Sequence, residues 1–315
     1  MNTEARSRIG FAAFWLAALA FVPVRAQLGM LTEIPLVDNV EASLPGGGGP
    51  EAIASDGTYI WVAEQFTNRV TRLDPLTGLR LGTFPVGTRP VALLAIGPTL
   101  WVANLESDTL TKLRTSDGAE LGTFRVGDGP GGLAFDGLHL WVAHRNNNTV
   151  SKVSLEGVVL ATFRTGRRPL NLAYDGVHLW VVNNLANTVI KLRPTDGAVL
   201  ATIRVGDGPF GILYDGAAIW VTNFFSRSVM KIRPADGARL GTFTMDDGPS
   251  GLATGGKTVW IANHGSSTVT RLDRATGTAI ATFKAGTGPF GIAFDGRNIW
   301  IANFGGGSVS TTLGQ

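Results

Sequence analysis

The sequence predicts an all-β protein, a seven-bladed β-propeller in which each blade contains four antiparallel strands. A Trp recurs seven times, at spacings of 40, 40, 39, 40, 40 and 40 residues. A Pro lies eleven residues before each of these Trp, so two markers share one period. A fixed period of this length is typical of repeat architectures. The markers are Trp61, Trp101, Trp141, Trp180, Trp220, Trp260 and Trp300, with Pro50, Pro90, Pro130, Pro169, Pro209, Pro249 and Pro289.

One copy of the repeat, residues 129–166, contains four short runs that favour strands. Asp-Gly or Glu-Gly pairs and polar stretches separate the runs. Asp-Gly is typical of tight hairpin turns because Gly tolerates positive φ. Short strands bounded by such turns indicate antiparallel sheet, and radial repetition of a four-stranded sheet gives a propeller. The runs are 131–135, 140–143, 149–153 and 158–163.

The seventh copy ends early, after the run 308–313, and lacks a fourth strand of its own. The segment Leu31-Thr32-Glu33-Ile34-Pro35-Leu36 resembles the fourth-strand segment 81–86. We therefore expect the N-terminal strand to complete the last blade, which would leave no open edge. Residues 37–49 would form the loop that leads into the first blade.

The N-terminus has the pattern of a secretion signal over residues 1–26. Arg6 and Arg8 precede an apolar run, and Val24-Arg25-Ala26 provides small residues at a cleavage position. An uncleaved membrane anchor is the alternative. After cleavage, residues 27–315 would form a single propeller domain with no integral membrane span. We expect a monomer that is secreted to the periplasm, the extracellular medium or the cell surface.

Composition narrows the chemistry of the mature chain. Cys is absent, so disulfides, thiolate metal sites and a Cys nucleophile are excluded. Residues 1–26 contain three Arg and one Glu, so their removal lowers the net charge from +3 to +1. A nearly neutral surface does not favour a nucleic-acid partner.

Residues that recur in every blade are expected to serve packing. This places the seven Trp between neighbouring blades, where an indole buries a large area. Lys or Arg recurs on the predicted third strand of six blades. We expect it to contact the Asp of the Asp-Gly turns, and a solvated basic belt is the alternative. The recurring cations are Arg72, Lys112, Lys152, Lys191, Lys231 and Arg271.

The residue three positions after each Trp is expected to form a ring near the mouth of the central channel. We refer to these seven residues as the ring positions. Asn at a strand end commonly caps the following turn, and ligand contact is the other interpretation. Glu64 and His144 depart from the pattern and are the stronger candidates. The remaining ring positions are Asn104, Asn183, Asn223, Asn263 and Asn303.

Beyond the ring positions, Arg145, Phe224, His264 and Phe304 are predicted on the same face. A polar mouth with Phe side chains could bind a protein, a peptide, a glycan or a small molecule, and an ordinary solvated rim is the alternative. No cofactor is expected. A divalent metal held by Glu64, His144 and His264 is a further hypothesis.

Trp220-Val221-Thr222-Asn223 and the frame Asp-Gly-x-x-x-Trp-Val-x-Asn resemble the YVTN-type propeller repeats, over about residues 31–313. Related propellers include the NHL group and streptogramin (virginiamycin B) lyase. The resemblance implies a secreted binding or scaffold module without catalysis. The alternative is a metal-dependent C–O lyase or lactonase-like hydrolase. Lyase repeats carry Glu after the Trp-containing strand, which this chain retains at Glu64 alone.

Overall fold

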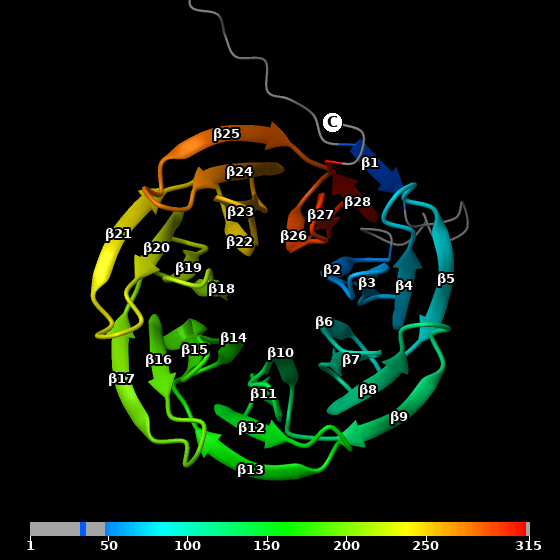
Figure 1. Ribbon diagram of the computed structural model, residues 1–315, viewed down its shortest axis with the longest axis horizontal. Coiled ribbons are helices and arrows are strands. Elements are labelled where there is room, and N and C mark those ends of the chain that lie inside the picture. Colours follow the sequence, from blue (N-terminus) through cyan, green and yellow to red (C-terminus); the bar gives the residue numbers. More distant parts are fainter. Residues whose placement is uncertain (1–31, 36–47, 313–315) are drawn as a thin grey trace, which may run out of the picture.

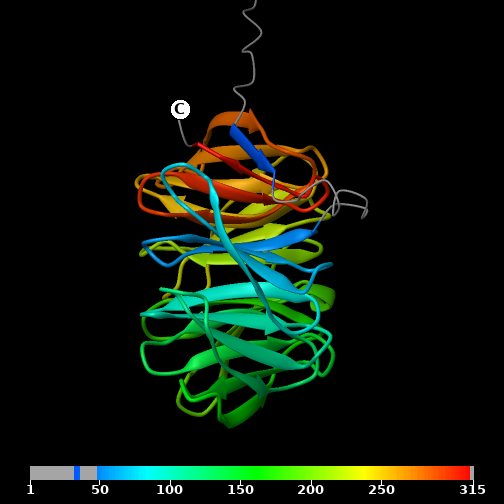
Figure 2. The same ribbon diagram turned by 90° about the vertical axis from the view of Figure 1, so that its right-hand side faces the viewer.

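The computed structural model describes residues 32–35 and 48–312. These residues form seven four-stranded antiparallel sheets arranged around a common axis, and Figure 1 looks along that axis. The view turned by 90° in Figure 2 shows the ring as a flat disc. The predicted all-β, seven-bladed architecture is confirmed. Within the described residues, no helix has the length and apolar character needed to cross a membrane.

The strands occupy four concentric positions (Figure 1). The innermost strands are β2 (Pro50–Ser55), β6 (Pro90–Ile96), β10 (Pro130–Phe135), β14 (Pro169–Tyr174), β18 (Pro209–Tyr214), β22 (Pro249–Gly255) and β26 (Pro289–Phe294). The second are β3 (Ile60–Glu64), β7 (Thr99–Asn104), β11 (Leu140–His144), β15 (Leu179–Asn183), β19 (Ile219–Asn223), β23 (Thr258–Asn263) and β27 (Ile299–Asn303).

The third and fourth positions complete each sheet. The third strands are β4 (Arg69–Leu73), β8 (Thr109–Arg114), β12 (Thr149–Val153), β16 (Thr188–Leu192), β20 (Ser228–Ile232), β24 (Thr268–Asp273) and β28 (Ser308–Thr311). The fourth are β5 (Arg80–Pro85), β9 (Glu120–Arg125), β13 (Val159–Arg164), β17 (Val199–Arg204), β21 (Arg239–Thr244), β25 (Ala279–Lys284) and, for the last blade, β1 (Thr32–Pro35). A short 3-10 turn, η2 (Asn184–Ala186), follows β15.

The hydrophobic core lies between neighbouring blades. Each second strand is buried along its length, because its two faces pack against different blades. Trp101 and Ala103 of one blade pack against Leu140 and Val142 of the next. The prediction that the Trp side chains pack between blades is confirmed. Burial of one such side chain contributes roughly 2–3 kcal/mol.

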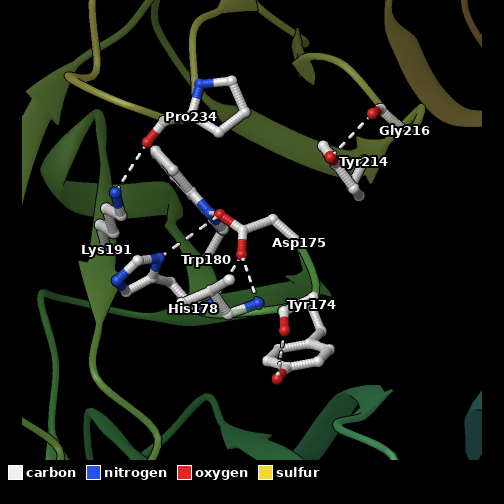
Figure 3. Close-up of polar contacts among 10 residues, drawn as sticks. Tyr174, Asp175, His178, Trp180, Lys191, Tyr214, Gly216 and Pro234 are labelled. Atoms are coloured by element: carbon white, nitrogen blue, oxygen red, sulfur yellow. Dashed lines mark hydrogen bonds and ion pairs between the residues drawn. The ribbon is translucent and has the colours of Figure 1, made fainter.

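In the described part of the chain, a polar contact links five of the core Trp to the turn before them, and in four blades a Lys beside the Trp reaches the next blade. In Figure 3, Trp180 Nε1 donates to Asp175 Oδ2 at 2.8 Å. Lys191 Nζ lies 5.5 Å from the centre of the Trp180 ring and donates to the carbonyl of Pro234 in the next blade at 2.7 Å. We call this arrangement the blade clasp.

The clasp corrects the expected role of the third-strand cations. The expected Lys–Asp contact is wrong, because the Asp carboxylate accepts the indole N–H instead. The solvated belt is wrong for Lys191, which is only 8% exposed. Equivalent bonds run from Lys112 to Leu155 O and from Lys231 to Arg274 O, both at 2.7 Å.

The last blade contains strands from both ends of the chain. β1 pairs antiparallel with β28, from Thr32 opposite Thr311 to Pro35 opposite Ser308. The outer ends of the predicted 31–36 strand lie outside the described residues. So do the predicted signal, residues 1–26, and all of the predicted loop 37–49 except Gly48 and Gly49.

Candidate functional site

The ring positions are buried inside their blades. All seven side chains are at most 2% exposed. Asn104 Nδ2 donates to Thr109 Oγ1 at 3.1 Å and to Thr111 Oγ1 at 3.0 Å, both on the adjacent third strand. The loop that leads into the blade covers Asn104, and a Cβ atom on Gly87 would lie 2.6 Å from Asn104 Cγ. This corrects the expectation that the ring positions face the channel mouth.

The other Asn ring positions make the same kind of contact. Each donates from Nδ2 to Ser or Thr hydroxyls on the third strand of its own blade, which ties the two strands together at the end where the loops meet. The partners are Thr188 for Asn183, Ser228 for Asn223, Thr268 and Thr270 for Asn263, and Ser308 and Ser310 for Asn303.

His144 takes the place of Asn in its blade without gaining access to solvent. Its Nε2 atom lies 2.9 Å from Ser151 Oγ, the residue equivalent to Thr111. Burial lowers the pKa of His144 to about 4, although the charges of Asp108 and Asp128 act in the opposite direction. The imidazole is therefore neutral at neutral pH and acts as a buried hydrogen-bonding group.

Glu64 is likewise accommodated within its own blade. Its Oε1 atom accepts a hydrogen bond from Thr71 Oγ1. It lies directly opposite Arg69 in the strand register, where the other six blades have Thr or Ser. Glu64 and Arg69 thus depart from the repeat together, as a pair of opposite charges. The departure at Glu64 has a structural explanation.

The proposed metal ligands Glu64, His144 and His264 do not come together. Glu64 and His144 are enclosed in different blades, and the His264 ring packs against Phe290 with centroids 5.4 Å apart. No group of three or more His, Asp or Glu side chains within residues 32–35 and 48–312 is placed to hold a metal ion. The residues suggested by the sequence therefore do not form a ligand set.

The innermost strands surround a cavity of about 360 Å³. Two charged residues line it, Glu51 from β2 and Arg145 from the loop after β11. Arg145 Nη2 is 3.8 Å from Glu51 Oε1, which is an ion pair but too long for a hydrogen bond. The Arg145 and Glu51 side chains are only 12% and 10% exposed. The buried Nε atom of Arg145 has no hydrogen-bond partner among the described residues.

The pKa values of this pair reflect its burial. Desolvation raises the pKa of Glu51, against the opposing charges of Arg145 and Arg89. Desolvation also lowers the pKa of Arg145; the charge of Glu51 opposes that shift, and those of Arg168 and Arg89 reinforce it. An ion pair whose side chains are largely removed from solvent is costly to desolvate. Both side chains line the cavity.

Aromatic side chains gather at the mouth, contributed by blades five, six, seven and one. Neighbouring ring centroids lie between 4.8 and 6.3 Å apart, and the pair Phe210–Phe290 is edge to face. Phe210 and Phe290 also line the cavity. We call this group the aromatic arc; its members are Phe66, Phe210, Phe224, Phe225, His264, Phe290 and Phe304.

Two further Arg residues lie near Arg145 in a strained backbone conformation. Arg89 and Arg168 have φ values of 58° and 54°, at the position before the first-strand Pro where the other five blades have Gly. A left-handed conformation costs a non-Gly residue roughly 1–2 kcal/mol. Arg89 pairs with Glu106 at 3.1 Å. In these two blades, a residue with a strained backbone thus carries a guanidinium group at this part of the mouth.

The sequence identified part of this site. Of the residues predicted at the mouth, Arg145 lines the cavity, whereas Phe224, His264 and Phe304 belong to the aromatic arc; that they contact a ligand stays a prediction. Glu51, Phe210 and Phe290 were not predicted as site residues. A signal existed: the residue after the first-strand Pro does not follow the repeat, being Glu, Val, Gly, Leu, Phe, Ser and Phe in chain order.

Comparisons with known proteins show the fold and no family. No protein-family model and no curated protein matches the chain. A solved streptogramin B lyase is 19% identical with a TM-score of 0.76, covering 89% of this chain and 96% of its own. The Kuenenia stuttgartiensis hydrazine synthase is 22% identical with a TM-score of 0.75, covering 88% of this chain and 97% of the matched one. The TM-scores establish a shared propeller architecture. At identities this low, the similarity shows the fold alone.

Proposed function

We propose that this propeller is a binding protein that takes up a small organic molecule at the mouth of its central channel. The observation that carries the proposal is the largely buried ion pair of Glu51 and Arg145, which lines a cavity together with Phe210 and Phe290. Concave sites that combine apolar walls with a few polar groups are typical of small-molecule sites. The Asn ring positions hold the ends of the second and third strands together through their hydrogen bonds.

The binding role is proposed without catalysis. A hydrolase or lyase needs a base, a nucleophile or a metal within reach of the substrate. His144 and Glu64 are enclosed by their blades, and His264 packs among Phe rings. The similarity to streptogramin B lyase extends to the fold, so the lyase hypothesis has no specific observation in its favour.

The cellular setting is also a proposal. The pattern of residues 1–26 supports export by a cleaved signal. Trp220-Val221-Thr222-Asn223 and the frame that repeats around it support a relation to YVTN-type propellers. A ligand-binding propeller outside the cytoplasm would meet small solutes directly. N-terminal sequencing of the exported protein would identify the mature start, expected after Ala26.

A thermal-shift screen tests the binding function. The probes are amino acids, aryl acids, nucleosides and monosaccharides, each added at a concentration of about 1 mM, applied to the wild type and to Phe290→Ala. We expect at least one chemical class to raise the Tm of the wild type and to lose this effect in the variant, because binding stabilises the native state by mass action. Equal shifts in both proteins, or no shift with any class, would refute a small-molecule site at the mouth.

A further inference from the structure

We infer that the ligand is a free aromatic α-amino acid, bound with its carboxylate at Arg145, its ammonium group at Glu51 and its ring against Phe210 and Phe290. This inference rests on the proposed binding function and specifies the ligand. It follows from the hydrogen-bond partners available to the side chains at the mouth and from the net charge of the residues that line the cavity.

The polar side of the mouth requires both an acceptor and a donor. The Nε atom of Arg145 is buried without a partner among the described residues. The Glu51 carboxylate lies 3.8 Å from Nη2, which gives an ion pair longer than a hydrogen bond and leaves room for a closer partner at either group. A ligand carboxylate matches the guanidinium fork, and an ammonium group donates to Glu51. An α-amino acid carries these two groups on one carbon atom, which suits two side chains this close together.

Charge balance favours a zwitterion over a simple anion or cation. Glu51 and Arg145 are the two charged residues that line the cavity, and their charges compensate each other. A zwitterionic head adds no net charge to a site that is largely removed from water. A monoanion would compete with Glu51 for Arg145 and leave that carboxylate buried without compensation, which is strongly unfavourable.

The apolar side of the mouth fits an aromatic side chain. Phe210 and Phe290 lie edge to face at 4.8 Å, and both line the cavity with Arg145 and Glu51. A third ring can join this pair in the offset or edge-to-face geometry that aromatic groups prefer. A cavity of about 360 Å³ lies within the size range of small-ligand sites.

The surrounding residues hold both halves of the site in place. A Cβ atom on Gly131 would lie 2.6 Å from Arg145 Nε, so Gly at this position makes room for the guanidinium group. Asn171 Nδ2 donates to the carbonyl of Phe210 at 2.9 Å. Ser250 Oγ donates to the carbonyl of Phe290 at 3.2 Å. Such preorganisation reduces the entropy lost on binding.

Isothermal titration with four probes tests the inference. L-phenylalanine carries all three recognised groups, N-acetyl-L-phenylalanine lacks the ammonium group, L-phenylalaninamide lacks the carboxylate and L-alanine lacks the ring. We expect L-phenylalanine to bind and each other probe to bind at least about tenfold more weakly, because each leaves a buried group unsatisfied or a ring surface uncovered. N-acetyl-L-phenylalanine or L-alanine binding as tightly as L-phenylalanine would overturn the inference.

Variants locate the binding and separate this inference from the proposed function. Arg145→Gln is expected to remove the preference for L-phenylalanine over L-phenylalaninamide. Arg227→Gln is the matched control, because Arg227 is an exposed Arg with φ of 46° that pairs with Asp247 away from the cavity. It is expected to retain full affinity. If L-phenylalanine fails to bind while another class shifts the Tm through Phe290, the inference is wrong and the binding function stands.

Discussion

Arg145 and Glu51 illustrate how a polar pair can be retained for recognition at a cost in stability. Their separation of 3.8 Å provides Coulomb attraction without a hydrogen bond, in a position nearly removed from water. Removing one partner leaves the charge of the other buried and uncompensated, which lowers the stability. Removing both charges avoids this cost. The stability of variants at these two positions therefore reports directly on the environment of the pair.

A double-mutant cycle measures this coupling. We expect Arg145→Gln and Glu51→Gln each to lower the free energy of unfolding by about 1–3 kcal/mol. The double variant should return to within about 1 kcal/mol of the wild type, because neither charge remains. Denaturant unfolding provides all four values. Additive losses would show that the two side chains do not form a coupled buried pair.

His144 makes stability dependent on pH in a defined window. Burial depresses its pKa to about 4 in the folded protein, against about 6.5 in the unfolded chain. Between these values the unfolded state binds more protons, so stability falls as the pH drops from about 6.5 to about 4 and levels off below. The full loss is about 3 kcal/mol.

The variant His144→Asn isolates this effect. Asn occupies the same position in five other blades, and Thr149 and Ser151 provide its third-strand partners. We expect stability near that of the wild type at pH 7 and higher than that of the wild type by about 3 kcal/mol at pH 4, because the variant has no buried imidazole to protonate. Chemical unfolding at both pH values measures the difference. Identical pH dependence in the two proteins would contradict a neutral, buried His144.

At the scale of the element, the blade clasp explains why Asp, Trp and Lys recur together. Asp175 accepts from Trp180 Nε1 at 2.8 Å and from the backbone N–H groups of Val177 and His178. One carboxylate thus shapes the first hairpin turn and satisfies the indole. In the second blade the equivalent residue is Ile96, and Trp101 Nε1 is buried without a partner among the described residues.

Asp175→Ala tests the clasp. We expect the free energy of unfolding to fall by about 2–3 kcal/mol, because the variant leaves a buried indole N–H unsatisfied and removes the acceptor of two turn bonds. Thermal or denaturant unfolding provides the comparison. Asp117→Ala is the control, since Asp117 is an exposed turn residue that makes no bond to a Trp in the described structure; a similar loss in this variant would count against the clasp.

The repeat allowed the strands to be predicted from the sequence, whereas the candidate ligand site could be predicted only in part. Packing demands the same residue in every blade, so the Trp and Pro markers predicted the strands and the core. The ring positions are buried because loops fold back over them, as the loop at Gly87 does over Asn104. The spacing of the repeats along the sequence gives no information about that contact. The pairing of Glu51 with Arg145 joins the first and third blades, which no local pattern specifies.

At the scale of the whole molecule, the ring is closed by pairing of β1 with β28. The resemblance of residues 31–36 to a fourth strand predicted this arrangement from the sequence. Without β1, the last blade would present β28 as an unpaired edge and lose one of its four strands. Unpaired edges promote association with other chains.

Deletion of residues 1–36 tests the contribution of the closing strand. We expect a Tm lower by about 5 °C or more, which corresponds to a loss of at least about 1–2 kcal/mol for a chain of this size. We also expect concentration-dependent association from the exposed edge. Deletion of residues 1–26 alone is the matched control. Equal Tm and a monomeric state for both truncated chains would show that the strand contributes little.

The most direct test of the central claim is a crystal structure of the protein grown with L-phenylalanine. We expect density for the amino acid in the channel mouth, with its carboxylate on Arg145, its ammonium group on Glu51 and its ring against Phe210 and Phe290. Density elsewhere on the propeller, or an empty mouth at a saturating concentration, would contradict the claim that this cavity is the ligand site.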